Sequence, residues 1–240
     1  MRPVRIFHAA PVLDQPDQPN QLQVSYHDCL RGELANVAAY CSAHPAHVEC
    51  STASPEVLGK QLSAFNLRIE HAGFGKDGTG YTVEHLYQAS KVFALPNGSR
   101  LMGGRAVLDA PSPLAAKRMV QQIAKRPGAR LVGFQYFNRE WVPVEALSVP
   151  QSYYSWLYCN ALHRQPELVR RLRRRGVTTT SDTKFNPNYG VACQAEAVAL
   201  FLAASAYDPT GDLMGTMLRS VRDFDRMVRP SVPRPSAVEL

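Results

Sequence analysis

Long hydrophobic runs are missing from this sequence of 240 residues. Its apolar stretches stay well short of the roughly 18 residues that a membrane-spanning helix needs. The opening residues, MRPVRIFHAAPVLDQPDQPN, hold few apolar side chains between arginines and an acidic, proline-broken stretch, which matches a secretory signal poorly. We therefore expect a cytoplasmic protein that does not contact membranes.

Cysteine pairs of the CxxC type are also missing. An odd number of cysteines without such pairs favours reduced, buried thiols over a disulfide framework. These cysteines are Cys29, Cys41, Cys50, Cys159 and Cys193. The segment HPAHVEC (44–50) gathers two histidines, a glutamate and a cysteine, but its spacing matches no structural zinc motif. We expect no metal site.

The common nucleotide and hydrolase motifs are absent as well. The sequence contains no P-loop, no GxGxxG after a strand and no GxSxG elbow, and we expect no cofactor. What it does contain is 45% hydrophobic and 20% charged residues, as in an ordinary globular protein. Its length suits one substantial domain or two small ones.

Periodicity and turn residues predict an α+β fold that is rich in helices and has a small sheet. Expected strands cover 4–9, 22–27, 47–52 and 130–137. Expected helices cover 31–42, 54–65, 81–93, 113–126, 152–164, 193–206 and 212–228, with an arginine-rich helix near 170–175. Tyr153, Tyr154, Trp156 and Tyr158 have the spacing of a core-facing helix, with a base-stacking platform as the alternative.

The helix over 81–93 poses a question, because Glu84, Gln88 and Lys91 lie on one helical stripe. Such a stripe is either an ordinary solvent-exposed surface of the helix or the wall of a catalytic cleft. Two further polar patches are LSAFNL (62–67), with Ser63 and Asn66, and the segment from 181 onward. That segment carries Asp182, Asn186 and Gln194. If the three patches meet, they form a polar pocket suited to a sugar or a nucleobase edge.

The net charge of +7 is concentrated in RRLRRR (170–175). Arg171, Arg173 and Arg174 in this run are either a solvated helix end or a patch that contacts phosphates. The second interpretation predicts binding to polyanions that weakens strongly with salt.

Six stretches together resemble the NADAR superfamily in order and spacing. They are LSAFNL, VEHLYQASKVF, GFQYFNREWVPVEA, SYYSWLYCNAL, SDTKFNPN and VACQAEAVALF. More closely, they resemble the NADAR antitoxins that are encoded beside DarT-type DNA ADP-ribosyltransferase toxins. The resemblance covers roughly residues 55–205. Glu196 departs from the family pattern, in which a basic residue follows the CQA of this stretch.

This resemblance implies a hydrolase that removes ADP-ribose from guanine in DNA by cleaving an N-glycosidic bond, so reversing the toxin. It implies ADP-ribosylated DNA as substrate, ADP-ribose as product and a toxin encoded nearby as possible partner. Catalytic roles fall to Glu84, Lys91 and Asp182. Glu84 stabilises positive charge on the sugar, whereas Lys91 either holds phosphates or attacks the opened ribose. Substrate contacts are expected from Ser63, Asn66, Gln88, Trp156, Asn186 and Gln194.

Two alternatives stay open at this point. One is a protein that does not catalyse, acting as an antitoxin through contact with the toxin or as an ADP-ribose binder. The other is an N-glycosidase of a small riboflavin-pathway metabolite. For the domain organisation we expect a strand and helix region over 1–54 packed on the core, a NADAR-like catalytic domain over 55–228, and a disordered proline-rich tail over 229–240.

Overall fold

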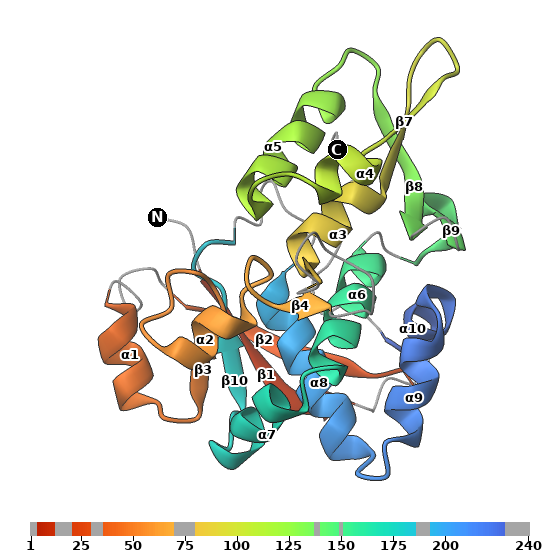
Figure 1. Ribbon diagram of the computed structural model, residues 1–240. Helices are drawn as coiled ribbons and strands as arrows, with labels where there is room; N and C mark the ends of the chain where they lie inside the picture. The colour runs from red at the N-terminus through yellow and green to blue at the C-terminus, as the bar shows by residue number, and fades with distance from the viewer. Residues whose placement is uncertain are drawn as a thin grey trace.

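The computed structural model describes residues 4–12, 21–29, 36–69, 80–136, 140–148, 151–185 and 193–228. Helices and short strands alternate along these segments (Figure 1). The α+β class predicted from the sequence is therefore confirmed.

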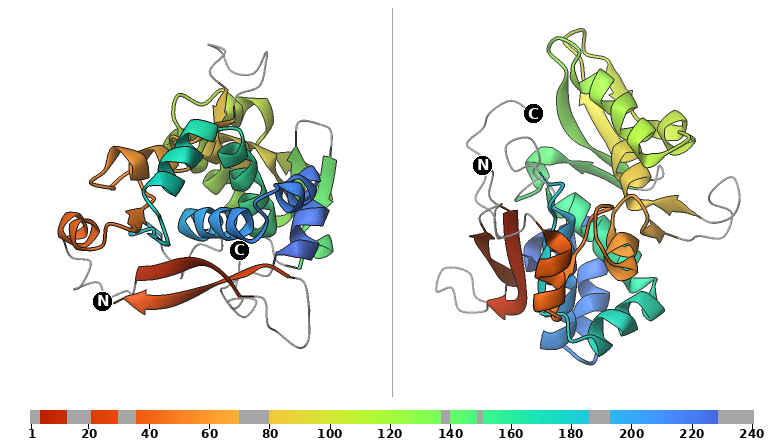
Figure 2. Two further views of the ribbon diagram at one scale, coloured as in Figure 1. Left: turned by 90° about the horizontal axis from the view of Figure 1, so that it is seen from below. Right: turned by 90° about the vertical axis from the view of Figure 1, so that its left-hand side faces the viewer.

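The first sheet joins three strands from the first 50 residues with one strand from residues 179–181. Its order is β2-β1-β10-β3. Its strands are β1 (Val4–Val12), β2 (Gln23–Cys29), β3 (His47–Glu49) and β10 (Thr179–Ser181). β1 pairs antiparallel with β2 and β10, while β10 runs parallel to β3, so a late strand lies between two early ones. Figure 2 shows β1 and β2 along one side of the molecule beside the long helix α8.

The second sheet is antiparallel throughout, with order β7-β6-β8-β9. Its strands are β6 (Lys91–Ala94), β7 (Arg100–Met102), β8 (Arg130–Tyr136) and β9 (Glu140–Pro143). A two-stranded pair, β4 (Arg68–Ile69) with β5 (Tyr81–Thr82), brings the chain before residue 70 beside the start of the next helix.

Ten helices and one 3-10 turn are present in the described residues. They are α1 (Val37–Ala43), α2 (Val57–Leu62), α3 (Val83–Ser90), α4 (Gly104–Leu108), α5 (Pro113–Ala124), η1 (Val144–Ala146), α6 (Gln151–His163), α7 (Pro166–Arg174), α8 (Gln194–Tyr207), α9 (Asp212–Arg219) and α10 (Val221–Met227). In Figure 1, α3, α4 and α5 gather against the second sheet, whereas α6 and α8 lie at the centre.

The core is built on α6 and α8, which contact each other. α8 is buried from Gln194 to Ala204 because α6 covers one side of it and β1 another, and the apolar run that follows Glu196 suits such a place. The aromatic residues of α6 are buried too, so the prediction that they form core is confirmed. All five cysteines lie in the described part of the chain and are buried free thiols, as expected.

The expected helix over 81–93 is wrong at both ends. Thr82 caps α3, with its side chain accepting a hydrogen bond from the backbone of His85, and the helix stops at Ser90. Lys91 has extended backbone angles (φ −65°, ψ 132°) and begins β6. β-branched Val92 and aromatic Phe93 favour a strand here, and both find partners on β7 and β8.

The expected long helix over 212–228 is also wrong, because Ser220 divides it. Ser220 is extended (φ −148°, ψ 162°), and its hydroxyl accepts a hydrogen bond from the backbone of Asp223, so a new helix begins there. Near the N-terminus, α1 begins at Val37, with Asn36 as its cap. The strand expected over 47–52 ends at Glu49.

Some predictions lie outside the described residues, namely the tail over 229–240 and most of the glycine-rich loop over 71–80. The boundary between residues 54 and 55 stays a prediction. Among the helices of the described segments, none combines the length and apolar character that crossing a bilayer demands.

Candidate functional site

The polar residues at the start of α3 are buried. Glu84 is 6% exposed and lies in the first turn of the helix, where the positive end of the helix dipole favours a carboxylate. Gln88, one turn further on, is 4% exposed and donates a hydrogen bond from Nε2 to Glu84 Oε1 at 2.9 Å. Because both groups are buried, they are not part of an ordinary solvent-exposed helix surface.

Lys91 reaches the same region from β6. It is partly buried, and its Nζ lies 4.3 Å from the centroid of the Tyr87 ring. Burial lowers the pKa of Lys91 from 10.5 to about 8; the negative charge of Glu84 raises it in part, and Lys117 lowers it. With a pKa of about 8, roughly one Lys91 side chain in ten is a neutral amine at pH 7.

The turn that follows α2 forms the second side of the site. Ser63 is buried, and its hydroxyl accepts a hydrogen bond from the backbone of Phe65 at 3.3 Å. Asn66 is exposed and donates from Nδ2 to the carbonyl of Lys60 at 2.7 Å. Both side chains therefore stabilise the turn in which Ala64 lies.

A series of hydrogen bonds through Ala64 connects the three polar patches. Asp182 Oδ2 accepts from Gln194 Nε2 at 2.8 Å, and Gln194 Oε1 accepts from the backbone N–H of Ala64 at 2.7 Å. The carbonyl of Ala64 accepts from the backbone N–H of Glu84 at 3.0 Å. The structure thus brings Ser63, Glu84, Gln88, Asp182 and Gln194 together, although they come from three separate segments.

Asp182 is almost fully buried beside a second carboxylate. Burial raises its pKa to about 7, and Glu49 acts in the same direction. Its Oδ1 accepts hydrogen bonds from the backbone N–H groups of Lys184 and Phe185, which with Gln194 oppose part of that shift. Asp182 therefore titrates near neutral pH while it holds the end of β10 in place.

One predicted substrate contact makes its hydrogen bond elsewhere in the core. Trp156 is buried, and its indole N–H donates to the carbonyl of Leu218 at 3.1 Å, so the indole holds α6 to α9. Its role as a substrate contact stays a prediction that this geometry does not favour. Asn186 lies outside the described residues.

Two tyrosines at the site, Tyr87 and Tyr154, were not among the residues predicted to form it. The Tyr87 ring lies under the Lys91 ammonium and contacts Tyr154 edge-on, with ring centroids 5.0 Å apart. Burial raises the pKa of Tyr154, and the negative charges of Glu84 and Asp182 act in the same direction. A signal for Tyr87 was available, since it lies four residues before Lys91.

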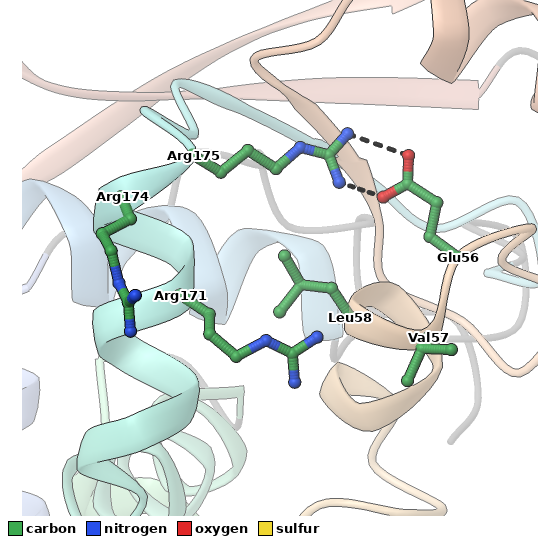
Figure 3. A pocket seen from close by; sticks show the side chains of 6 residues that line it. All are labelled: Glu56, Val57, Leu58, Arg171, Arg174 and Arg175. Carbon is green, nitrogen blue, oxygen red and sulfur yellow. Dashed lines mark hydrogen bonds and ion pairs between the residues drawn. The ribbon is translucent and has the colours of Figure 1, made fainter.

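The arginine-rich segment forms α7, and its arginines differ in their surroundings. Arg171, Arg174 and Arg175 line a shallow pocket of about 490 Å³ together with Glu56, Val57 and Leu58 of the neighbouring segment (Figure 3). Arg173 is exposed and does not line this pocket. The pocket lies between α2 and α7, and Glu84 is not among its lining residues.

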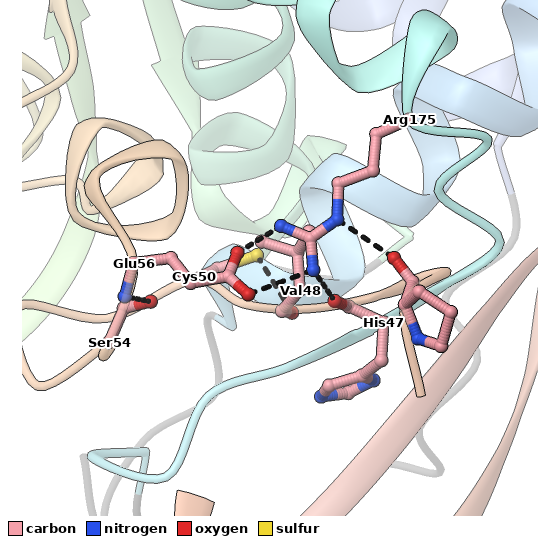
Figure 4. A network of polar contacts seen from close by, with 7 residues as sticks. His47, Val48, Cys50, Ser54, Glu56 and Arg175 are labelled. Carbon is pink, nitrogen blue, oxygen red and sulfur yellow. Dashed lines mark hydrogen bonds and ion pairs between the residues drawn. The ribbon is translucent and has the colours of Figure 1, made fainter. Parts of the chain in front are cut away.

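The segment 44–50, with its histidines, glutamate and cysteine, is held by other contacts. His47 Nε2 forms a hydrogen bond with Ser181 Oγ at 2.9 Å, and Glu49 accepts hydrogen bonds from Ser181 and from Thr183. Arg175 donates to the carbonyls of Pro45 and His47 and pairs with Glu56 (Figure 4). Across the described segments, no group of three or more His, Cys, Asp or Glu side chains is arranged to hold a metal ion.

The arrangement supplies the parts that acid–base or nucleophilic chemistry on a sugar needs. A buried carboxylate stabilises developing positive charge, and an amine with a lowered pKa is available as a nucleophile. The amide of Gln88 fixes one oxygen of that carboxylate.

Comparison with known proteins identifies a family. A search of the curated proteins gives no match. A family model described as the DarT1-associated NADAR antitoxin matches residues 32–234, and because that match spans most of the chain, the protein belongs to this family of antitoxins.

Proposed function

We propose that this antitoxin is a hydrolase that removes ADP-ribose from guanine bases of DNA by cleaving the N-glycosidic bond, so reversing the action of a DarT1 toxin. The observation that carries the proposal is the buried pair of functional groups at α3 and β6. Glu84 is 6% exposed, and burial lowers the pKa of the neighbouring Lys91 to about 8. A protein that acts only by binding has little use for an amine held partly neutral at this site.

Glu84 and Lys91 divide the chemistry in this proposal. The bond between C1″ of the ribose and the guanine nitrogen breaks, and positive charge develops on the sugar, which the Glu84 carboxylate stabilises. The neutral Lys91 amine bonds to C1″, and guanine leaves with a proton. The C1″–O4″ bond then opens to an imine, and water hydrolyses it to ADP-ribose and free lysine.

The other residues bind and position in this scheme. Gln88 donates to Glu84 from its amide nitrogen. The carbonyl oxygen of Gln88 then accepts a hydrogen bond from a ribose hydroxyl or the guanine edge. Asp182 acts through Gln194, because their hydrogen bond fixes the Ala64 turn against the backbone of Glu84. Ser63 and Asn66 stabilise the same turn, and Asn186 stays a proposed contact to the base or the second ribose.

The arginines of α7 are proposed to contact the DNA backbone. Replacing Arg171, Arg173 and Arg174 together by glutamine is expected to raise the KM for modified DNA and to flatten its dependence on salt, because fewer counterions are released on binding. Unchanged kinetics would exclude this contact.

The direct test uses an oligonucleotide that carries ADP-ribosyl-guanine. We expect the wild type to release ADP-ribose and unmodified DNA, and Glu84→Gln and Lys91→Ala to release neither. Exposed residues of the same types, in Glu145→Gln and Lys125→Ala, are the matched controls. Borohydride during turnover is expected to trap ADP-ribose on Lys91 as a stable amine.

Three results would contradict parts of this proposal. Tight binding of ADP-ribose or toxin without release would make the protein a binder. Release only from a small nucleoside-like glycoside would make it an enzyme with a metabolite as substrate. Release without a trapped adduct on Lys91 would leave this lysine as a contact to phosphate.

A further inference from the structure

The pocket between α2 and α7 presents two arginines with unused donors. Its walls are Arg171, Arg174 and Arg175 on one side and Glu56, Val57 and Leu58 on the other (Figure 3). Arg171 and Arg174 are three residues apart on a helix and therefore lie on one face. Val57 is 67% exposed, so an apolar side chain stands at the rim of a cationic pocket.

Arg175 is occupied by the protein itself. Its guanidinium pairs with both oxygens of Glu56 and also donates to the carbonyls of Pro45, at 2.8 Å, and His47, at 3.0 Å (Figure 4). These contacts join the end of α7 to β3 and to the start of α2. Arg175 is therefore a structural clamp, and it neutralises the one carboxylate that lines the pocket.

Arg171 and Arg174 are held much more loosely. Arg171 donates to a neutral group, Gln61 Oε1, at 2.6 Å. Arg174 Nη2 lies 3.4 Å from Glu167, a carboxylate that also pairs with Arg170. Since a guanidinium has five N–H donors, both arginines keep donors for a ligand, and the paired geometry of those donors suits phosphate oxygens.

One short helix connects this pocket to the candidate catalytic site. Val57 and Leu58 at the start of α2 line the pocket, and Ala64, just beyond its end, is hydrogen-bonded to Gln194 and Glu84. At 1.5 Å per residue, α2 separates the two places by roughly 10 Å. That length corresponds to roughly three nucleotides along one strand of a duplex, and to fewer in an extended strand.

We infer that this pocket binds a backbone phosphate of the DNA strand, two or three nucleotides from the modified guanine. Arg171 and Arg174 hold the phosphate, Gln61 orients Arg171, and Val57 contacts the adjoining deoxyribose. The inference rests on the proposed function, and it defines the substrate as a strand with flanking phosphates and not an isolated modified nucleoside.

The test compares two pairs of arginines of equal charge. The variant is Arg171→Gln with Arg174→Gln, and the control is Arg126→Gln with Arg222→Gln, two exposed residues outside α7 that do not line the pocket. Hydrolysis is measured on a modified oligonucleotide with flanks on both sides and on ADP-ribosyl-guanosine. Binding of a fluorescent, unmodified single strand is measured over a range of salt concentrations.

We expect the pocket variant to lose about tenfold in kcat/KM on the oligonucleotide and to keep its rate on the nucleoside. Its salt slope for binding a single strand should fall by about 0.7, because the one phosphate that the two arginines hold is no longer neutralised. The control variant should change both quantities by a smaller amount. Unchanged folding, checked by circular dichroism, is expected for both variants.

Equal losses in the two variants would overturn the inference, since the charge would then act diffusely. An unaffected pocket variant would overturn it as well. So would a variant that loses only its binding to the purified toxin, because an acidic protein segment would then be the occupant. Absence of hydrolysis by the wild type, with strand binding still dependent on Arg171 and Arg174, would refute the proposed reaction and support the phosphate site.

Discussion

Replacing Lys91 by methionine is expected to stabilise the fold at neutral pH while abolishing hydrolysis. Burial lowers the pKa of Lys91 from 10.5 to about 8. A lysine that binds its proton more weakly in the folded chain than in the unfolded chain disfavours folding wherever it is charged in the unfolded chain. Methionine has a similar length and no charge, so the variant removes this penalty and keeps most of the packing.

The size of the effect follows from two opposing contributions. A fall in pKa from 10.5 to about 8 corresponds to ~3 kcal/mol. The ammonium also lies 4.3 Å from the centroid of the Tyr87 ring, and removing that cation–π interaction costs about 0.5–2 kcal/mol. We therefore expect a net gain of ~1–2 kcal/mol, which raises the Tm of a chain of this size by roughly 2–8 °C.

The pH dependence gives the sharper test. The gain should be fully present below pH 8 and should shrink as the pH rises from 8 to 10.5, because Lys91 is then neutral when folded and loses its charge when unfolded. Thermal unfolding followed by circular dichroism at pH 7 and pH 10 measures it, with exposed Lys125→Met as the control. A variant that melts at or below the wild-type Tm at pH 7, or a gain that is equal at both pH values, would refute the reasoning.

Three further substitutions test other contacts. Tyr87→Leu should lower the pKa of Lys91 by a further ~0.4–1.5, because the ring no longer stabilises the ammonium, and the pH below which ADP-ribose release declines should fall with it, while Tyr87→Phe, which keeps a ring beneath the ammonium, should stay near wild type. Gln194→Leu should lower the free energy of unfolding in urea by about 2–4 kcal/mol, because it leaves two buried partners unsatisfied, whereas exposed Gln122→Leu should change it by less than about 0.5 kcal/mol. Arg175→Gln should lower it by ~1–3 kcal/mol through loss of the clamp, and Arg173→Gln should have little effect; equal values for the two arginines would contradict the clamp.

Elements with local signals were predictable from the sequence. α5 begins at Pro113 as expected, with Ser112 as its cap, and the apolar run of α8 forms a buried helix. The end of α3 was not predictable, because Lys91 fits the helical spacing equally well. What decides its conformation is pairing of β6 with β7 and β8, which lie up to about forty residues later, and tertiary contacts of this kind override local preference.

In the candidate site, the residues that act through their side chains were predictable, whereas the residue that acts through its backbone was not. Glu84, Gln88, Asp182 and Gln194 attract attention through their polar side chains. The residue that joins them is Ala64, which contributes only its backbone N–H and C=O, so no pattern of residue types reveals it. Helical spacing does predict that Arg171 and Arg174 lie on one face of their helix and that Arg173 lies on another.

The position of β10 has a consequence for the order in which the chain folds during synthesis. β1 and β3 are made early, yet the strand that lies between them comprises residues 179–181. Until the ribosome has released that segment, both early strands present unpaired edges, which are prone to mispairing with other chains. Nearly three quarters of the chain must therefore emerge before the first sheet closes, and since Asp182 directly follows β10, the hydrogen bonds through Ala64 are completed only after that point.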